Sequence, residues 1–120
     1  MSTGWFKVLF GVVGFVFFCA GVFHFLAIFF PNISEPLPWW EHALFVLINF
    51  TMAGLWAFRV KWLPWAFLAL TIQQLWQHGG DLIHGLQEHP PRIDWQSVFA
   101  LGGLVPMWLL MRAWVKAGKP

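Results

Sequence analysis

The side chains best suited to chemistry in this chain are its histidines, because imidazole binds metal ions and exchanges protons near neutral pH. His24 lies about two turns before the end of a long apolar run, His42 follows a proline-rich segment, and His78 and His84 lie in a glutamine-rich stretch. Together with nearby carboxylates, these imidazoles form a ligand set suited to Zn, Cu or Fe. A pair of histidines on two helices, such as His24 and His42, is also suited to holding a haem.

Two acidic residues extend this set. Gln74, His78 and Asp81 are spaced i, i+4 and i+7, so a helix would place them on one face. Glu41 directly precedes His42. The predicted metal ligands are His24, His42, His78, Asp81 and His84. In a metal-free enzyme, His78, Asp81 and Glu41 would instead act as acid and base.

The composition predicts that lipid is the solvent for the elements that carry these residues. The chain has 120 residues, of which 59% are hydrophobic and only 10% charged. Soluble domains have about 25% charged residues. Aromatic residues make up 20% of the chain and include ten Trp but no Tyr. Many of these tryptophans lie near the ends of apolar runs, as expected for rings at the membrane interface.

Turn-forming and charged residues divide the chain into four helical segments. No charged residue occurs between Val8 and Pro31, and about 20 apolar residues suffice to cross the hydrocarbon core. Prolines and short basic or polar stretches separate the remaining runs. We expect an all-α integral membrane four-helix bundle, a single domain of residues 1–120, with helices at about 6–30, 39–58, 62–86 and 95–115.

The distribution of charge predicts the topology. The N-terminus, the segment between the second and third helices and the C-terminus contain six of the seven basic residues, namely Lys7, Arg59, Lys61, Arg112, Lys116 and Lys119. Every acidic residue lies in or beside one of the other two connections: Glu35, Glu41, Asp81, Glu88 and Asp94. By the positive-inside rule, we expect both termini to be cytoplasmic. The compact chain and its regular charge bias lead us to expect a multi-pass protein of a bacterial inner membrane.

This topology brings the chemically competent residues to one leaflet, because the first and third helices run outward and the second runs inward. Intramembrane polar groups usually face the bundle interior or a wet cavity. One periplasm-facing pocket is therefore expected to contain His24, Glu41, His42, Asn49, Gln74, His78, Asp81 and His84. The single cysteine, Cys19, forms neither an intramolecular disulfide nor a zinc knuckle. No Gly-rich phosphate loop or nucleic-acid-binding pattern is present.

Several functions agree with such a pocket. The first is a small inner-membrane protein that binds a transition metal or haem, with a redox role. The second is a metal-free acid–base enzyme that acts on a lipid or another apolar small molecule. The third is a non-catalytic subunit of a larger membrane complex, and a transporter ranks last. The expected partners are membrane lipid, an apolar substrate, and further copies of the chain or other subunits.

The stretch Ala20-Gly-Val-Phe-His24, late in an apolar first helix, resembles the start of small four-helix membrane proteins of the DoxX-like group. The chain length and the four-span layout are similar as well. The resemblance implies a compact bundle and a link to membrane redox chemistry, but no specific activity. The segment from His78 to His84 has no counterpart in this resemblance.

Overall fold

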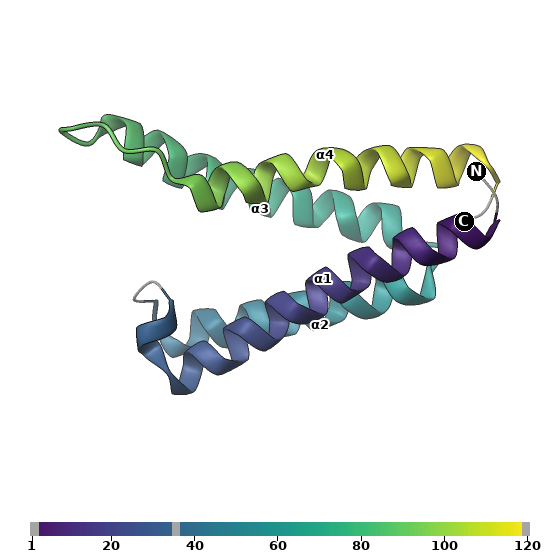
Figure 1. The fold of residues 1–120 in the computed structure, drawn as a ribbon, viewed down its shortest axis with the longest axis horizontal. Coiled ribbons are helices and arrows are strands. Elements are labelled where there is room, and N and C mark those ends of the chain that lie inside the picture. Colours follow the sequence, from purple (N-terminus) through teal and green to yellow (C-terminus); the bar gives the residue numbers. More distant parts are fainter. Residues whose placement is uncertain (1–2, 35–36, 119–120) are drawn as a thin grey trace. The chain divides into compact units, whose positions relative to one another are not determined.

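The computed structural model describes residues 3–34 and 37–118, and every regular element in these ranges is a helix. The α-helices are α1 (Thr3–Phe29), α2 (Trp39–Phe58), α3 (Leu63–Gln87) and α4 (Trp95–Lys116), and a short 3-10 helix, η1 (Pro31–Ile33), follows α1 (Figure 1). The expected all-α fold with four long helices is therefore confirmed. Glu35 and Lys119, which entered the charge count, lie outside the described residues.

Three of the helices are long and apolar enough to cross a membrane, namely α1, α2 and α4. In each, only 17% of the most apolar stretch is buried inside the protein. Helix α3 is as long as its neighbours, but its second half contains Gln73, Gln74, Gln77, His78 and Asp81. This polar half explains why α3 does not join the other three on composition.

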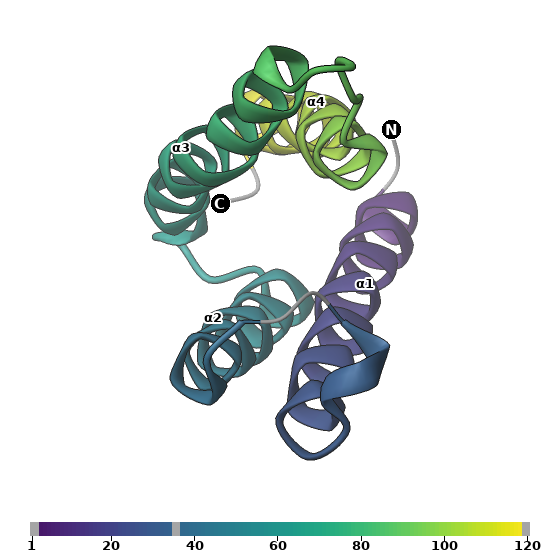
Figure 2. The same cartoon turned by 90° about the vertical axis from the view of Figure 1, so that its left-hand side faces the viewer.

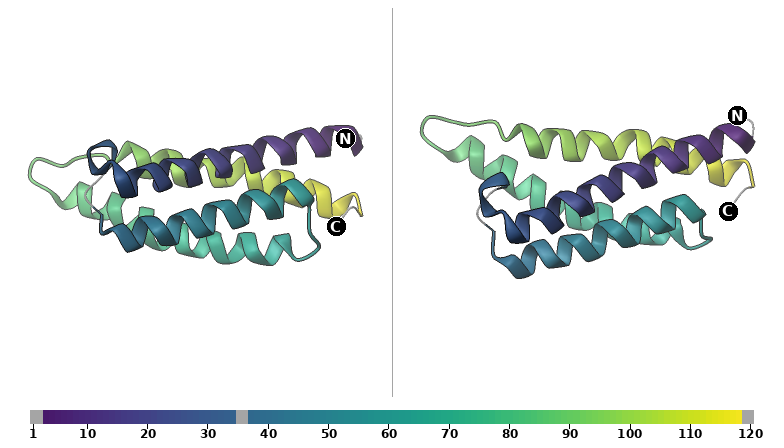
Figure 3. Two further views of the ribbon diagram at one scale, coloured as in Figure 1. Left: turned by 90° about the horizontal axis from the view of Figure 1, so that it is seen from below. Right: turned by 60° about the horizontal axis from the view of Figure 1, so that its bottom comes forward.

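The chain divides into two compact units, Met1–Leu63 and Pro64–Pro120, each of which contains one helical hairpin. The expectation of a single domain stays a prediction. In the first unit, α1 and α2 run antiparallel and in contact along their length (Figure 3). The ring contacts follow this register: Phe10 lies 5.0 Å from Trp56 and Phe18 lies 5.5 Å from Phe50, measured between ring centroids.

Two buried glycines let α1 and α2 approach closely. A Cβ atom at Gly14 would lie 3.0 Å from the backbone oxygen of Ala53, and one at Gly21 would lie 2.8 Å from the ring of Phe50. Small residues at such crossings allow helix backbones to pack where lipid provides no hydrophobic driving force. The close approach sets the register that carries His24 toward α2.

In the second unit, α3 and α4 form another antiparallel hairpin (Figure 2). Phe67 packs against Trp108 in a tilted arrangement at a centroid distance of 5.0 Å, and the Trp108 indole N–H donates a 2.9 Å hydrogen bond to Thr71 Oγ1. At the opposite end of the hairpin, Gly85 packs against the turn: a Cβ there would lie 2.6 Å from the backbone oxygen of Arg92. The Arg92 N–H also donates to the Gly85 oxygen at 2.8 Å.

Local signals define the ends of the helices. Helix α2 begins after Pro38 and ends at Arg59, whose left-handed backbone (φ 51°) lets its N–H cap the last carbonyls. Helix α4 begins after Asp94, whose side chain accepts a hydrogen bond from the Ser97 N–H. This cap matters below, because Ser97 also contacts a histidine of α3.

Candidate functional site

The N-terminal hairpin brings His24 of α1 against His42 of α2. Their Nδ1 atoms are 3.1 Å apart and their ring centroids 5.4 Å apart. His42 is only 3% exposed, and His24 is half-buried beside the ring of Phe45, at a centroid distance of 4.9 Å. The antiparallel register of α1 and α2 therefore places two imidazoles of different helices in direct contact, in an apolar setting.

Ser34, which follows η1, completes this cluster from the connection between α1 and α2. Its Oγ lies 3.3 Å from His42 Nε2. The two nitrogens of the His42 ring thus face different partners, an imidazole on one side and a hydroxyl on the other. We call His24, Ser34 and His42 the histidine pair site.

The contact between the two Nδ1 atoms limits the protonation states of the rings. If the contact is a hydrogen bond, one Nδ1 donates and the other accepts, so at least one Nδ1 carries a lone pair. In the alternative state, in which the ring protons reside on the Nε2 atoms, both Nδ1 atoms carry lone pairs. For His42, that state makes Nε2–H a donor to Ser34 Oγ, a partner that fixes the tautomer of the ring.

The C-terminal hairpin holds a second histidine in a different way. His78 Nδ1 of α3 lies 2.9 Å from Ser97 Oγ, and Ser97 Oγ donates to Asp94 Oδ2 at 2.7 Å. Ser97 is fully buried in the first turn of α4. The hydrogen bond from the Ser97 hydroxyl holds the pKa of Asp94 below its usual range, so this carboxyl group is ionised at neutral pH.

The order of His78, Ser97 and Asp94 in this hydrogen-bond chain determines which atom donates and which accepts. An ionised Asp94 can only accept, so the single hydroxyl proton of Ser97 points to it. Ser97 Oγ is then an acceptor toward α3, and His78 Nδ1 must be the N–H donor. Because the serine lies between histidine and aspartate, the histidine cannot take the serine proton. The arrangement therefore differs from a nucleophilic Ser–His–Asp triad, in which histidine is in the middle.

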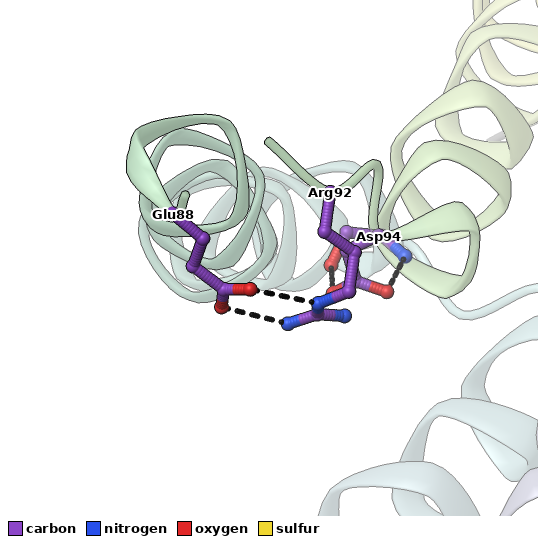
Figure 4. Close-up of polar contacts among 4 residues, drawn as sticks. Glu88, Arg92 and Asp94 are labelled. Atoms are coloured by element: carbon purple, nitrogen blue, oxygen red, sulfur yellow. Dashed lines mark hydrogen bonds and ion pairs between the residues drawn. The ribbon is translucent and has the colours of Figure 1, made fainter. Parts of the chain in front are cut away.

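The turn between α3 and α4 carries an ion pair next to this chain. Arg92 donates from Nε and one terminal nitrogen to the two oxygens of Glu88, both at 3.2 Å (Figure 4). The Arg92 guanidinium lowers the pKa of Glu88, mainly through the hydrogen bond. The pair is solvent-exposed, so it orders the turn and contributes little to stability.

The remaining predicted site residues are less engaged. Glu41 is half-buried in the first turn of α2, whereas Asp81 and His84 are exposed on α3. Asn49 donates to the Phe45 oxygen at 2.8 Å, and Gln74 donates to Gln73 at 2.7 Å. The amides of Asn49 and Gln74 therefore form hydrogen bonds within their own helices.

The predicted five-ligand metal set divides between the two hairpins. His24 and His42 are in contact in the first hairpin, while His78, Asp81 and His84 belong to the second. Across residues 3–34 and 37–118, no three His, Cys, Asp or Glu side chains gather as metal ligands. A common pocket for all five stays a prediction.

Three contributors escaped the sequence reasoning: Ser34, Asp94 and Ser97. The spacing Asp94-x-x-Ser97 before an apolar run is a helix-start signal. Combined with an antiparallel α3–α4 hairpin, that signal could have placed Ser97 beside His78. Ser34 offered no comparable signal, because it lies in an irregular connection.

In comparisons with known proteins, no family model, no curated protein and no solved structure matches the chain.

Proposed function

We propose that this protein crosses the inner membrane four times, with both termini in the cytoplasm, and binds a transition-metal ion through His24 and His42. Three features support the membrane assignment: the apolar length of α1, α2 and α4, their largely unburied apolar surface, and the low charge of the chain. Helix α3 would be the fourth span, with its polar half facing protein or water.

The charge distribution supports the orientation. Lys7 precedes the apolar part of α1, Arg59 and Lys61 join α2 to α3, and Lys116 ends α4. In the proposed topology all four are cytoplasmic, as the positive-inside rule requires. The histidine pair site and the α3–α4 turn would then belong to the periplasmic side.

The observation that carries the metal assignment is the 3.1 Å separation of the two Nδ1 atoms. Metal–imidazole bonds measure about 2.0–2.1 Å, so two nitrogens at this spacing fit adjacent positions around one ion. Nitrogens on opposite sides of one metal would lie about 4 Å apart. The spacing therefore favours an ion chelated by both rings over a haem held between them.

Ser34 supports the same assignment. Metal binding through both Nδ1 atoms requires the ring protons on Nε2, and histidine ligands usually donate that proton to a second group. Ser34 Oγ lies where it can accept from His42 Nε2. Imidazole suits Zn, Cu and Fe, and water would fill the remaining positions of the ion. Copper or iron would provide the redox role that the DoxX-like resemblance implies, which stays a proposal.

Metal titration of the purified protein in lipid nanodiscs tests this function. With Cu²⁺ and Zn²⁺ as probes, we expect one ion per chain. His24→Ala and His42→Ala should each weaken binding more than the about 100-fold limit typical of outer-shell changes, whereas Ser34→Ala should weaken it roughly 10- to 100-fold. His84→Ala and His89→Ala, which alter exposed histidines, are the matched controls.

Circular dichroism shows whether each variant retains its helices. Absence of metal binding by the folded wild-type protein would refute the proposal, as would equal loss in the His84→Ala control. A Soret band in the purified protein would show that the site binds haem instead of a metal ion.

Thiol labelling tests the topology separately. In a Cys19→Ala background, a cysteine at Pro91 should react with a membrane-impermeant maleimide added to spheroplasts, and a cysteine at Lys61 should react only after lysis. The reverse pattern would invert the proposed orientation.

A further inference from the structure

The hydrogen bonds that link His78 through Ser97 to Asp94 fix the tautomer of His78 and leave its Nε2 atom as a hydrogen-bond acceptor. Since His78 Nδ1 must donate to Ser97, the neutral ring carries its lone pair on Nε2. No hydrogen bond reaches this nitrogen from the described part of the chain. It is not among the buried, unpartnered polar atoms of the described residues either, so it is open to a ligand.

No hydrogen bond joins the neighbouring glutamine amides of α3 to this nitrogen in the described part of the chain. Gln74 donates to Gln73 at 2.7 Å, and Gln73 donates to Gln77 at 2.6 Å. The three amides lie in the turn and a half that precedes His78, and these two bonds use the Oε1 atoms of Gln73 and Gln77 and one N–H each of Gln73 and Gln74. On this part of α3, the hydrogen bond across the hairpin to Ser97 fixes the ring of His78 with Nε2 as its acceptor.

We propose that His78 Nε2 is a binding site for the hydroxyl group of an apolar molecule, a phenol or alcohol dissolved in the membrane. A lone-pair acceptor selects a hydrogen-bond donor, which excludes esters, ethers and ketones as partners for this atom. In lipid, an unmet acceptor is costly, and an apolar molecule with a single hydroxyl satisfies it without bringing in charge.

Ser97 and Asp94 are positioning residues for this site. Ser97 holds the Nδ1 proton, and Asp94 holds the hydroxyl proton of Ser97, so both must be present for the Nε2 lone pair to be guaranteed. The full burial of Ser97 protects the chain from water that would otherwise exchange these roles.

A matched pair of probes tests the proposal in nanodiscs: 4-octylphenol and its methyl ether, which has nearly the same shape but no donor. We expect the phenol to bind more tightly, by several-fold to about tenfold, the range of a neutral hydrogen bond. Ser97→Ala should abolish this preference, and His84→Ala should preserve it. Equal binding of phenol and ether by the wild-type protein would overturn the proposal.

Nitrogen NMR provides a readout that does not depend on any variant. With ¹⁵N-labelled histidine, His78 should appear as the Nδ1–H tautomer, and its Nε2 resonance should shift when the phenol is added but not when the ether is. In Ser97→Ala, the tautomer should become mixed. An Nε2–H tautomer in the wild-type protein would refute the site even if a ligand bound elsewhere. The metal titration of the histidine pair is unaffected by either result.

Discussion

The two hairpins hold their histidines by contrasting means. In the N-terminal hairpin, glycines bring α1 and α2 together and His24 meets His42 directly, with Ser34 as the further partner. In the C-terminal hairpin, His78 is linked through Ser97 to the ionised Asp94. Under the proposed function, the first arrangement would offer two imidazole nitrogens to one cation. The second would offer a single, directed acceptor, so the hydrogen-bond partners of each histidine would decide what it binds.

The contrast is sharpest at the glycines that shape each hairpin. Gly85→Ala should destabilise the C-terminal hairpin by about 1–3 kcal/mol, since its Cβ would lie 2.6 Å from the Arg92 backbone oxygen, which cannot move without opening the turn. Thermal unfolding in detergent measures the change. Gly80→Ala is the control, since a Cβ there meets nothing within 4 Å. A stable Gly85→Ala protein would show that the turn is not fixed by this contact.

In the N-terminal hairpin, two glycines are expected to differ from each other. Gly14→Ala should be destabilising by about 1–2 kcal/mol, because the added Cβ meets the backbone of Ala53 at 3.0 Å. Gly21→Ala meets only the ring of Phe50, which is partly exposed and can turn aside. Its smaller effect, relative to Gly14→Ala, would show in the unfolding midpoint and in the metal affinity of the histidine pair site. The opposite ranking would contradict the helix register described here.

Removal of the central hydroxyl tests how the second hairpin is held. Ser97→Ala should cost about 1–2 kcal/mol, since it leaves the N–H of the half-buried His78 without its acceptor. Unfolding followed by circular dichroism measures the loss. Ser34→Ala is the counterpart in the first hairpin and should cost less, because Ser34 Oγ is 3.3 Å from its imidazole and only half-buried.

Acid should affect the second hairpin through Asp94. Its pKa in the folded protein lies below the ordinary value of 3.8, so its contribution to stability is complete above about pH 3.8 and is lost as pH falls through the folded pKa. Unfolding midpoints between pH 5 and 2 should therefore drop less steeply in Asp94→Asn than in the wild-type protein. Asp81→Asn, an exposed control, should retain the wild-type slope.

The smallest effect is expected for the ion pair of the α3–α4 turn. Glu88→Gln should leave the unfolding midpoint at pH 7 unchanged within error, because the pair with Arg92 is exposed to solvent. The pKa of Glu88 lies below 4.5, so any contribution disappears as pH falls below that value. A clear drop in the unfolding midpoint at pH 7 would show that the exposed ion pair contributes more to stability than expected here.

The helices could be predicted from the sequence, because long apolar runs and the intervening prolines and charges leave few alternatives. The encounter of His24 with His42 also follows from an antiparallel first hairpin. The chain through Ser97 does not, since it depends on side-chain rotamers and on which face of α3 meets the first turn of α4. Hydropathy reports how apolar a helix is, but not which of its faces contacts a given partner.

Electron paramagnetic resonance of Cu²⁺ added to the protein in nanodiscs tests the central claim most directly. The account predicts superhyperfine splitting from two imidazole nitrogens in the wild-type protein, from one in His24→Ala, and again from two in His78→Ala. A spectrum without two-nitrogen coupling, or one that changes with His78 rather than His24, would contradict it.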